Sequence, residues 1–308
     1  MPNDIKKLKT KKFTWIDISQ ATQEHLKYLK TDYGFESSDL NDCLPTIQRQ
    51  KIHNRGNYIF AVLQFPYYNR TTQSIEASEI DLFVGKNFII TVHEDELAPL
   101  VDFYYICQTD PIMKSQLRSE EVMTILHKIF NKLYNYCYPI LNHINLDINQ
   151  IEKDILEQPE EKTIKNILIV KRNIVNFQKS MQSHRSILQK LIEYTENWRP
   201  AKSHNDYNNL ISFTKDIWDS LVNYKDTVNA LHETQESMTS LKINEIMKTL
   251  TIFSVIVFPL TLLAAIFGMN TMNAMPFMNS PYDFWYIMGI MLVGMLIMFG
   301  FFKKKKWL

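Results

Sequence analysis

Polar side chains that can interact with an ion recur on one face of a segment that carries no charge. From Thr249 to Tyr282, a run of 34 residues, there is no Asp, Glu, Lys, Arg or His. In and just before this run, seven residues recur at steps of three and four and therefore share one face of a helix: Asn244, Met247, Leu250, Ser254, Phe258, Thr261 and Ala265. A face that mixes amide, hydroxyl and apolar side chains is typical of a pore lining, and also of helix packing within a membrane. The spacing leaves both interpretations open.

Two stretches are long and apolar enough to cross a bilayer. Thr249–Phe267 has 14 apolar residues in 19, and Phe284–Phe302 has 16 in 19. At about 1.5 Å per residue each covers roughly 28 Å, close to the thickness of a hydrocarbon core. Two helices cannot enclose a polar path, so the pair is either an anchor or one part of an assembled pore.

Positive charge predicts the orientation of these spans. Lys303, Lys304, Lys305 and Lys306 follow the second span, whereas the connecting loop has no Lys or Arg. Basic residues stay on the cytoplasmic side, so we expect both termini in the cytoplasm.

Composition excludes several classes of function. Residues 1–248 hold 30 basic and 32 acidic side chains, which argues against a nucleic-acid binder. The seven glycines form no phosphate-binding loop, which argues against a nucleotide-driven transporter. Three scattered cysteines favour a reducing compartment. We do not expect an enzyme.

The soluble part predicts a small α/β domain followed by long helices. Strands are expected at 13–18, 58–68, 80–84 and 88–92, and helices at 23–33, 38–44 and 97–108. His93 to Glu96 is interpreted as a solvated turn. Beyond these, an apolar stripe indicates a helical hairpin, whose second arm carries Ile164, Leu168, Ile174, Phe177, Met181, Leu188 and Leu191. No Pro or Gly interrupts residues 201–258, which predicts one helix running into the first span.

The expected organisation has seven parts. An α/β domain (1–115) and a helical hairpin (116–200) are followed by a stalk helix (201–248). The remainder is a first span (249–269), an outer loop (270–282), a second span (283–302) and a basic tail (303–308).

Gly268-Met269-Asn270 follows the first span, and a Gly-Met-Asn motif at this place resembles the CorA-type magnesium channels. Asn244 to Lys248, Pro259-Leu260-Thr261, Met275-Pro276 and the basic C-terminus are similar to the family as well. The resemblance covers essentially the whole chain. It implies a homopentamer in the lipid bilayer of the bacterial inner membrane, with a funnel-shaped cytoplasmic part and the first span of each subunit lining a central pore.

The resemblance also implies residue roles. Asn270, with Gly268 and Met269, forms a selectivity filter of amide oxygens for hydrated Mg²⁺, which is the substrate. The seven-residue face described above lines the pore, with Met247 and Leu250 as an apolar constriction. Phe258 and Ala265 stand where the family pattern has Met and Gly. Lys303 to Lys306 form a positive collar at the inner mouth.

Regulation is implied at two carboxylates. By resemblance, Asp42 and Glu233 bind cytoplasmic Mg²⁺ between subunits and favour the closed state; the alternative is that both are solvated surface acids. Asn41 stands where a second acid is common, and Glu233 where Asp is expected.

Two other functions stay open. A zinc-transporting branch shares the Gly-Met-Asn motif, although Phe277 stands here in place of the acid expected after Met275-Pro276. A membrane-anchored coiled-coil scaffold without a pore explains the helices, but it does not explain the Gly-Met-Asn motif directly after the first span. Passage of Mg²⁺, with Co²⁺ or Ni²⁺, is the leading hypothesis.

Overall fold

The computed structural model describes residues 5–44, 48–157, 161–198, 204–269, 281–305 and 307. The chain divides into two compact units, residues 1–232 and 233–308, which are described separately. The strands are β1 (Lys6–Lys9), β2 (Thr14–Ser19), β3 (Lys51–Asn54), β4 (Tyr58–Asn69), β5 (Ser74–Gly85) and β6 (Phe88–His93). The helices of the first unit are α1 (Gln23–Tyr33), α2 (Ser37–Asp42), α3 (Ala98–Thr109), α4 (Pro111–Leu117), α5 (Val122–Glu157), α6 (Glu161–Met181), α7 (His184–Tyr194), a 3₁₀ turn at Glu196–Trp198 and the start of α8 (His204–Phe267).

The six strands form one mixed sheet in the order β1-β2-β6-β5-β4-β3. β2 and β6 run parallel, and the other neighbours are antiparallel. β4 and β5 pair along their whole length, from Tyr58 opposite Gly85 to Asn69 opposite Ser74. β6 pairs only with the second half of β5, from Ile80 to Val84. The first half of β5 therefore has β4 on one side and no described strand on the other.

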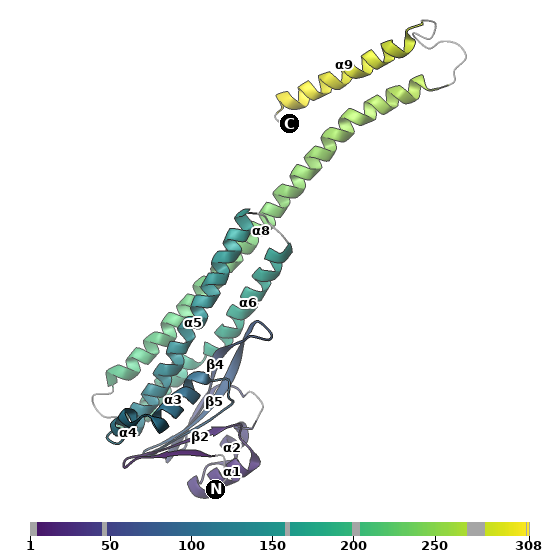
Figure 1. Cartoon of the computed structure of the whole chain (residues 1–308). Coiled ribbons are helices and arrows are strands. Elements are labelled where there is room, and N and C mark those ends of the chain that lie inside the picture. The colour runs from purple at the N-terminus through teal and green to yellow at the C-terminus, as the bar shows by residue number, and fades with distance from the viewer. Residues whose placement is uncertain are drawn as a thin grey trace. The chain divides into compact units, whose positions relative to one another are not determined.

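Helices cover both faces of this sheet (Figure 1). On one face Ile16, Phe60 and Phe83 form a core with Leu29 of α1 and Leu40 of α2. On the other face Trp15 packs edge-on against Tyr104 of α3. On this face α6 also contacts β4 and β5, and α5 contacts β4 and β6. Burial on both sides explains why the central strands are almost continuously apolar rather than alternating.

The long helices confirm the predicted hairpin, with two differences. The second arm breaks between Met181 and His184, so that α6 and α7 are separate helices. Ile164 and Leu168, predicted to lie on the buried stripe, are exposed, and Ile167 and Val170 are buried instead. The register shifts because the contacts are made to β4 and β5 as well as to α5.

Other elements differ from the sequence prediction. β1, β3 and α4 were not predicted, and β5 begins at Ser74 rather than at Ile80. His93 is wrongly predicted as part of a solvated turn: it is the last residue of β6, is 4% exposed, and its Nε2 lies 3.1 Å from Oδ1 of buried Asp17.

The second unit consists of the rest of α8 and α9 (Asp283–Lys304). Both hold an apolar segment long enough to cross a membrane, with mean hydropathies of 2.5 and 2.1. The fold class is thus as predicted: an α/β domain, long helices and two C-terminal apolar helices.

Candidate ion pathway and regulatory site

The predicted pore face lies on one unbroken helix. All seven of its residues belong to α8, which continues through Pro259 to Phe267. Met247, Leu250 and Phe258 are 55–71% exposed within the single chain. Exposed apolar side chains such as Phe253 and Val257 also surround them. A helix that is apolar on all sides needs lipid or further helices around it, because water solvates it poorly.

The hydroxyl groups of this helix are arranged to accept hydrogen bonds. The Thr261 hydroxyl donates to the Val257 carbonyl at 2.9 Å, and that of Thr251 to the Met247 carbonyl at 2.8 Å. Since each proton is used within the helix, the hydroxyl oxygen keeps lone pairs on its outer side. Water molecules around a cation present their hydrogens outward, so a face of acceptors suits a hydrated cation.

α8 ends just before the Gly-Met-Asn motif. The Gly268 N–H donates to the Ala264 carbonyl at 2.9 Å, and the Met269 N–H to the Ile266 carbonyl at 3.2 Å. A Cβ at Gly268 would lie 3.2 Å from the Ala264 oxygen, so glycine lets the last turn close tightly. Asn270, the predicted filter residue, lies outside the described residues.

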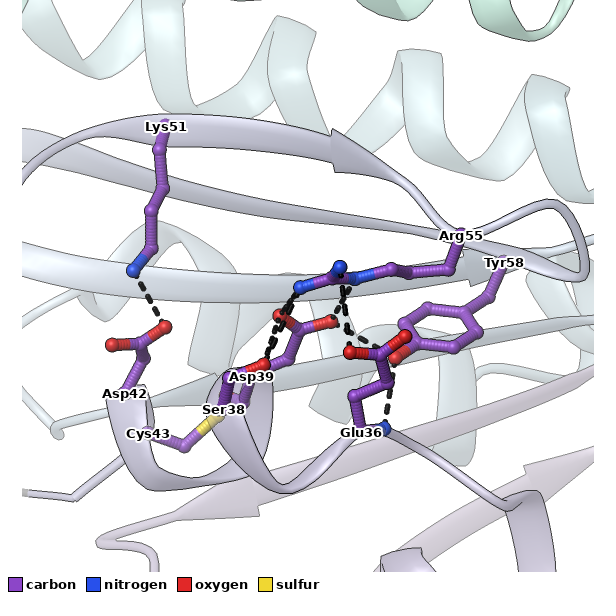
Figure 2. Close-up of polar contacts among 8 residues, drawn as sticks. All are labelled: Glu36, Ser38, Asp39, Asp42, Cys43, Lys51, Arg55 and Tyr58. Atoms are coloured by element: carbon purple, nitrogen blue, oxygen red, sulfur yellow. Dashed lines mark hydrogen bonds and ion pairs between the residues drawn. The ribbon is translucent and has the colours of Figure 1, made fainter.

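A buried ion pair fixes α2, the helix that carries Asp42 (Figure 2). Asp39 is 1% exposed and accepts hydrogen bonds from Arg55 Nη2 at 2.5 Å and Nε at 2.9 Å, and from the Tyr58 hydroxyl at 2.9 Å. Burial alone raises the pKa of Asp39, but the Arg55 and Tyr58 hydrogen bonds hold the pKa below its ordinary value. The Tyr58 oxygen also accepts from the Glu36 N–H at 3.0 Å, which ties the start of α2 to the sheet.

Asp42 is the last residue of α2, and its carboxylate is paired with the ammonium group of Lys51. Its Oδ2 lies 2.5 Å from Lys51 Nζ on β3, and the two side chains are 20% and 30% exposed (Figure 2). Glu233, its predicted partner, is an exposed residue of α8 in the other unit.

Lys51 and Arg55 were missed as site residues, although the sequence holds a signal for them. Asp39 and Asp42 are three residues apart, which is one helix face, and Lys51 and Arg55 are an even number of residues apart, which places them on one side of an extended chain. At the other end of the chain, Lys303, Lys304 and Lys305 are exposed at the end of α9, and Lys306 lies outside the described residues.

Residues 10–304 match the family described as CorA-like Mg²⁺ transporter protein. The chain belongs to this family. The cobalt/magnesium transport protein CorA of Thermotoga maritima is 27% identical over 296 residues, which cover 96% of this chain and 83% of that protein. Relatives of the CorA family are thus transport proteins.

Solved structures in and near the CorA family share the fold. The complete structure of the CorA magnesium transporter from Methanocaldococcus jannaschii superposes with a TM-score of 0.83 at 21% identity, over 96% of this chain and 92% of that one. The cytoplasmic domain of ZntB from Vibrio parahaemolyticus has a TM-score of 0.62 at 11% identity, over 76% of this chain and 89% of that one. These likenesses extend to both the soluble unit and, for the complete structure, the two apolar helices.

Proposed function

We propose that this chain assembles as a homopentamer into a passive channel for Mg²⁺, with Co²⁺ or Ni²⁺ as further substrates. The observation that carries the proposal is the seven-residue face of α8, where the exposed Thr261 hydroxyl donates its proton within the helix and so keeps its oxygen as an acceptor in an otherwise apolar segment. Five such helices around an axis supply rings of acceptors, whereas a single pair of spans encloses no path.

The proposed filter is a ring of Asn270 amide oxygens at the outer mouth, directly after Gly268 and Met269 in the sequence. Mg²⁺ loses its water reluctantly and demands near-ideal octahedral coordination. Neutral oxygens that hydrogen-bond the hydrated ion avoid this dehydration penalty, and they release the ion more easily than a ring of carboxylates. Deeper in the pore, Asn244 and Thr261 form polar rings, and Met247 and Leu250 form the constriction that closes by dewetting.

The proposed gate is controlled by cytoplasmic Mg²⁺ bound between subunits at Asp42 and Glu233. A carboxylate oxygen is a ligand that Mg²⁺ prefers, and Asp42 is partly exposed at the end of a rigid helix. Because Lys51 already neutralises Asp42, Mg²⁺ must compete with this lysine. Bound ion favours the closed state only to the extent that it binds that state more tightly.

In the proposed topology both termini are cytoplasmic, and Lys303 to Lys306 surround the inner mouth. This collar repels cations from the cytoplasmic side and attracts anionic lipid headgroups.

Ion flux into proteoliposomes tests the proposal. Purified chain should admit Mg²⁺ above the level of empty vesicles, and Asn270→Ala should lose selective flux while its oligomer, measured by native mass spectrometry, stays intact. No flux with the intact chain, or a monomer, would favour a scaffold without a pore. Entry of Zn²⁺ without Mg²⁺ would assign the chain to the zinc-transporting branch.

A further inference from the structure

The chain at the start of β3 is held by side chains from several elements of the first unit. β3 begins at Lys51, has four residues and is the edge strand beside β4. The end of a short edge strand opens easily, because its backbone hydrogen bonds are few and lie on one side only. The position of Lys51, which is paired with Asp42, therefore depends on what fixes residues 48–50.

The side chain of Gln50 ties this segment to the end of α6. Its Nε2 donates hydrogen bonds to the Ser180 carbonyl at 2.8 Å and to the Lys179 carbonyl at 3.2 Å. α6 ends at Met181, and the last carbonyls of a helix have no partner within that helix. Gln50 supplies a donor to two of these carbonyls, so the start of β3 and the end of α6 hold each other in place.

Gln48 fixes the same segment to the two longest strands of the sheet. Its carbonyl accepts a hydrogen bond from Gln64 Nε2 of β4 at 2.8 Å, and its N–H donates to Glu79 Oε2 of β5 at 2.5 Å. The Gln64 Oε1 also lies 3.4 Å from Gln50 Nε2. Residues 48–50 are therefore attached to β4, β5 and α6 before the strand pairing of β3 begins.

Lys51 follows Gln50 directly in the chain and reaches a different helix. Its Nζ lies 2.5 Å from Oδ2 of Asp42, the last residue of α2. The Cα atoms of the two consecutive residues are about 3.8 Å apart across one peptide unit, so a displacement of Gln50 also displaces Lys51. The capped end of α6 and the ion pair at α2 are thus joined by one peptide bond.

We infer that Gln50 is a positioning residue for the regulatory site: through its hydrogen bonds to the end of α6, it keeps the Lys51 ammonium against Asp42. The inference rests on the proposed role of Asp42 in binding Mg²⁺ and adds a residue that does not itself touch the ion. Without the Gln50 hydrogen bonds the start of β3 opens more often, and Lys51 leaves Asp42 more often with it. Mg²⁺ then meets less competition at Asp42, and the proposed channel closes at a lower cytoplasmic Mg²⁺ concentration.

Chemical labelling of Lys51 tests the positioning without any ion flux. An amine-acylating reagent modifies a lysine more slowly while its ammonium is held in an ion pair, and mass spectrometry of the digested full chain follows each lysine separately. Gln50→Met keeps the length of the side chain and removes its donor. In this variant, without Mg²⁺, we expect Lys51 to be labelled about 2- to 10-fold faster, the factor that a net hydrogen bond represents.

The matched control is Gln182→Met, the same substitution at an exposed position between α6 and α7. It should leave the labelling rate of Lys51 unchanged. Should Gln50→Met fail to fold, as judged by circular dichroism, Gln64→Met is the second variant. It removes the donor to the Gln48 carbonyl and carries the same expectation.

Flux into proteoliposomes then links the position of Lys51 to gating. The half-inhibitory Mg²⁺ concentration should fall in Gln50→Met, by no more than it falls in Lys51→Met. The double variant should match Lys51→Met alone, because Gln50 acts through Lys51. A substitution that only destabilises the fold would shift the midpoint equally with and without Lys51, and that result would overturn the inference.

The labelling and flux results separate this inference from the proposed function. Equal labelling of Lys51 in Gln50→Met and in the unaltered chain overturns the positioning role, even where Lys51→Met lowers the half-inhibitory Mg²⁺ concentration. Faster labelling in Gln50→Met, with no change of that concentration in either single variant, confirms the positioning of Lys51 and rejects Asp42 as the Mg²⁺ sensor.

Discussion

Lys51 Nζ on β3 lies 2.5 Å from Oδ2 of Asp42 at the end of α2. The carboxylate proposed to sense Mg²⁺ therefore has a resident monovalent counter-ion. The net free energy of Mg²⁺ binding at Asp42 is the gain from the divalent ion minus the loss of this pair. In the proposed gate, Lys51 therefore sets the Mg²⁺ concentration at which Asp42 responds.

In the Lys51→Met variant, the proposed channel should close at a lower cytoplasmic Mg²⁺ concentration than in the unaltered chain. A partly exposed ion pair contributes about 0.2–1 kcal/mol, so removal of the competing ammonium should lower the half-inhibitory Mg²⁺ concentration by about 1.4- to 5-fold. Flux into proteoliposomes at graded Mg²⁺ on the cytoplasmic face measures it. Lys27→Met, on exposed surface of α1, is the control. An unchanged midpoint in Lys51→Met would show that Asp42 does not sense Mg²⁺.

The Asp39→Asn variant should loosen α2. It leaves the Arg55 guanidinium, which now makes two hydrogen bonds to Asp39 and lies 3.4 Å from Glu36, without its buried partner. Breaking one side of a buried pair costs about 3–5 kcal/mol. Hydrogen exchange of the α2 amides should accelerate, and inhibition by Mg²⁺ should weaken because Asp42 loses its fixed position. Asp42→Asn, which leaves the Asp39 pair intact, should weaken inhibition without faster exchange; equal exchange in both variants would contradict this role of Asp39.

Lowering the pH should reduce the free energy of unfolding of the first unit, because His184 is buried in its neutral form. This residue is fully buried; its Nε2 donates to the Gln64 carbonyl at 2.7 Å, so Nδ1, 3.0 Å from the Tyr134 oxygen, accepts the Tyr134 hydroxyl and the ring is neutral. Burial lowers the pKa of His184 to about 4, from an ordinary value of 6.5. Between these values the unfolded chain binds a proton that the folded chain does not, so the free energy of unfolding falls as pH drops from 6.5 to 4, by on the order of 3 kcal/mol.

Urea unfolding at pH 7.5 and pH 4.5, followed by tryptophan fluorescence, measures this loss. His184→Gln should flatten the dependence, because an amide can replace both hydrogen bonds and does not titrate in this range. His53→Gln, at an exposed position, should leave it unchanged. The same pH dependence in His184→Gln and in the unaltered chain would assign the effect to other groups.

The Leu250→Ser variant should make the proposed gate leak. A hydroxyl at an apolar constriction retains water and lowers the barrier to a hydrated ion. We expect flux that persists at millimolar cytoplasmic Mg²⁺, where we propose that the unaltered chain is closed. Ile256→Ser places the same hydroxyl about 120° around the helix, away from the seven-residue face, and should stay closed. Leakage in both variants would show that any polar residue in this span disturbs packing, and would remove Leu250 from the constriction.

The sequence predicted those elements whose own pattern is strong. α1 was predicted at 23–33, which are its observed bounds, and in the structure Thr22 caps its start and Gly34 its end. The two apolar helices follow from length and hydropathy alone. α8 was predicted as one helix because no Gly or earlier Pro offers a break before Pro259.

Elements that depend on distant neighbours were missed. β1 reads Lys-Lys-Leu-Lys and β3 reads Lys-Ile-His-Asn, so neither carries the apolar alternation of a strand. Both are edge strands, where charged residues are tolerated because only one side is paired. His93 was predicted to be solvated because it follows the predicted strand 88–92, whereas in the structure it ends that strand and contacts buried Asp17, 76 residues away in the chain. The roles of Asn270 and Glu233 stay predictions.

The unbroken course of α8 has a consequence for how a signal could travel. Glu233 and Met247 are 14 residues apart on one helix, which is about 21 Å along its axis and about 40° short of four full turns. The two side chains are thus held at nearly the same angular phase by a ladder of backbone hydrogen bonds with no loop between them. If α8 rotates about its axis as a rigid body, a rotation at Glu233 therefore turns the Met247 side chain through the same angle.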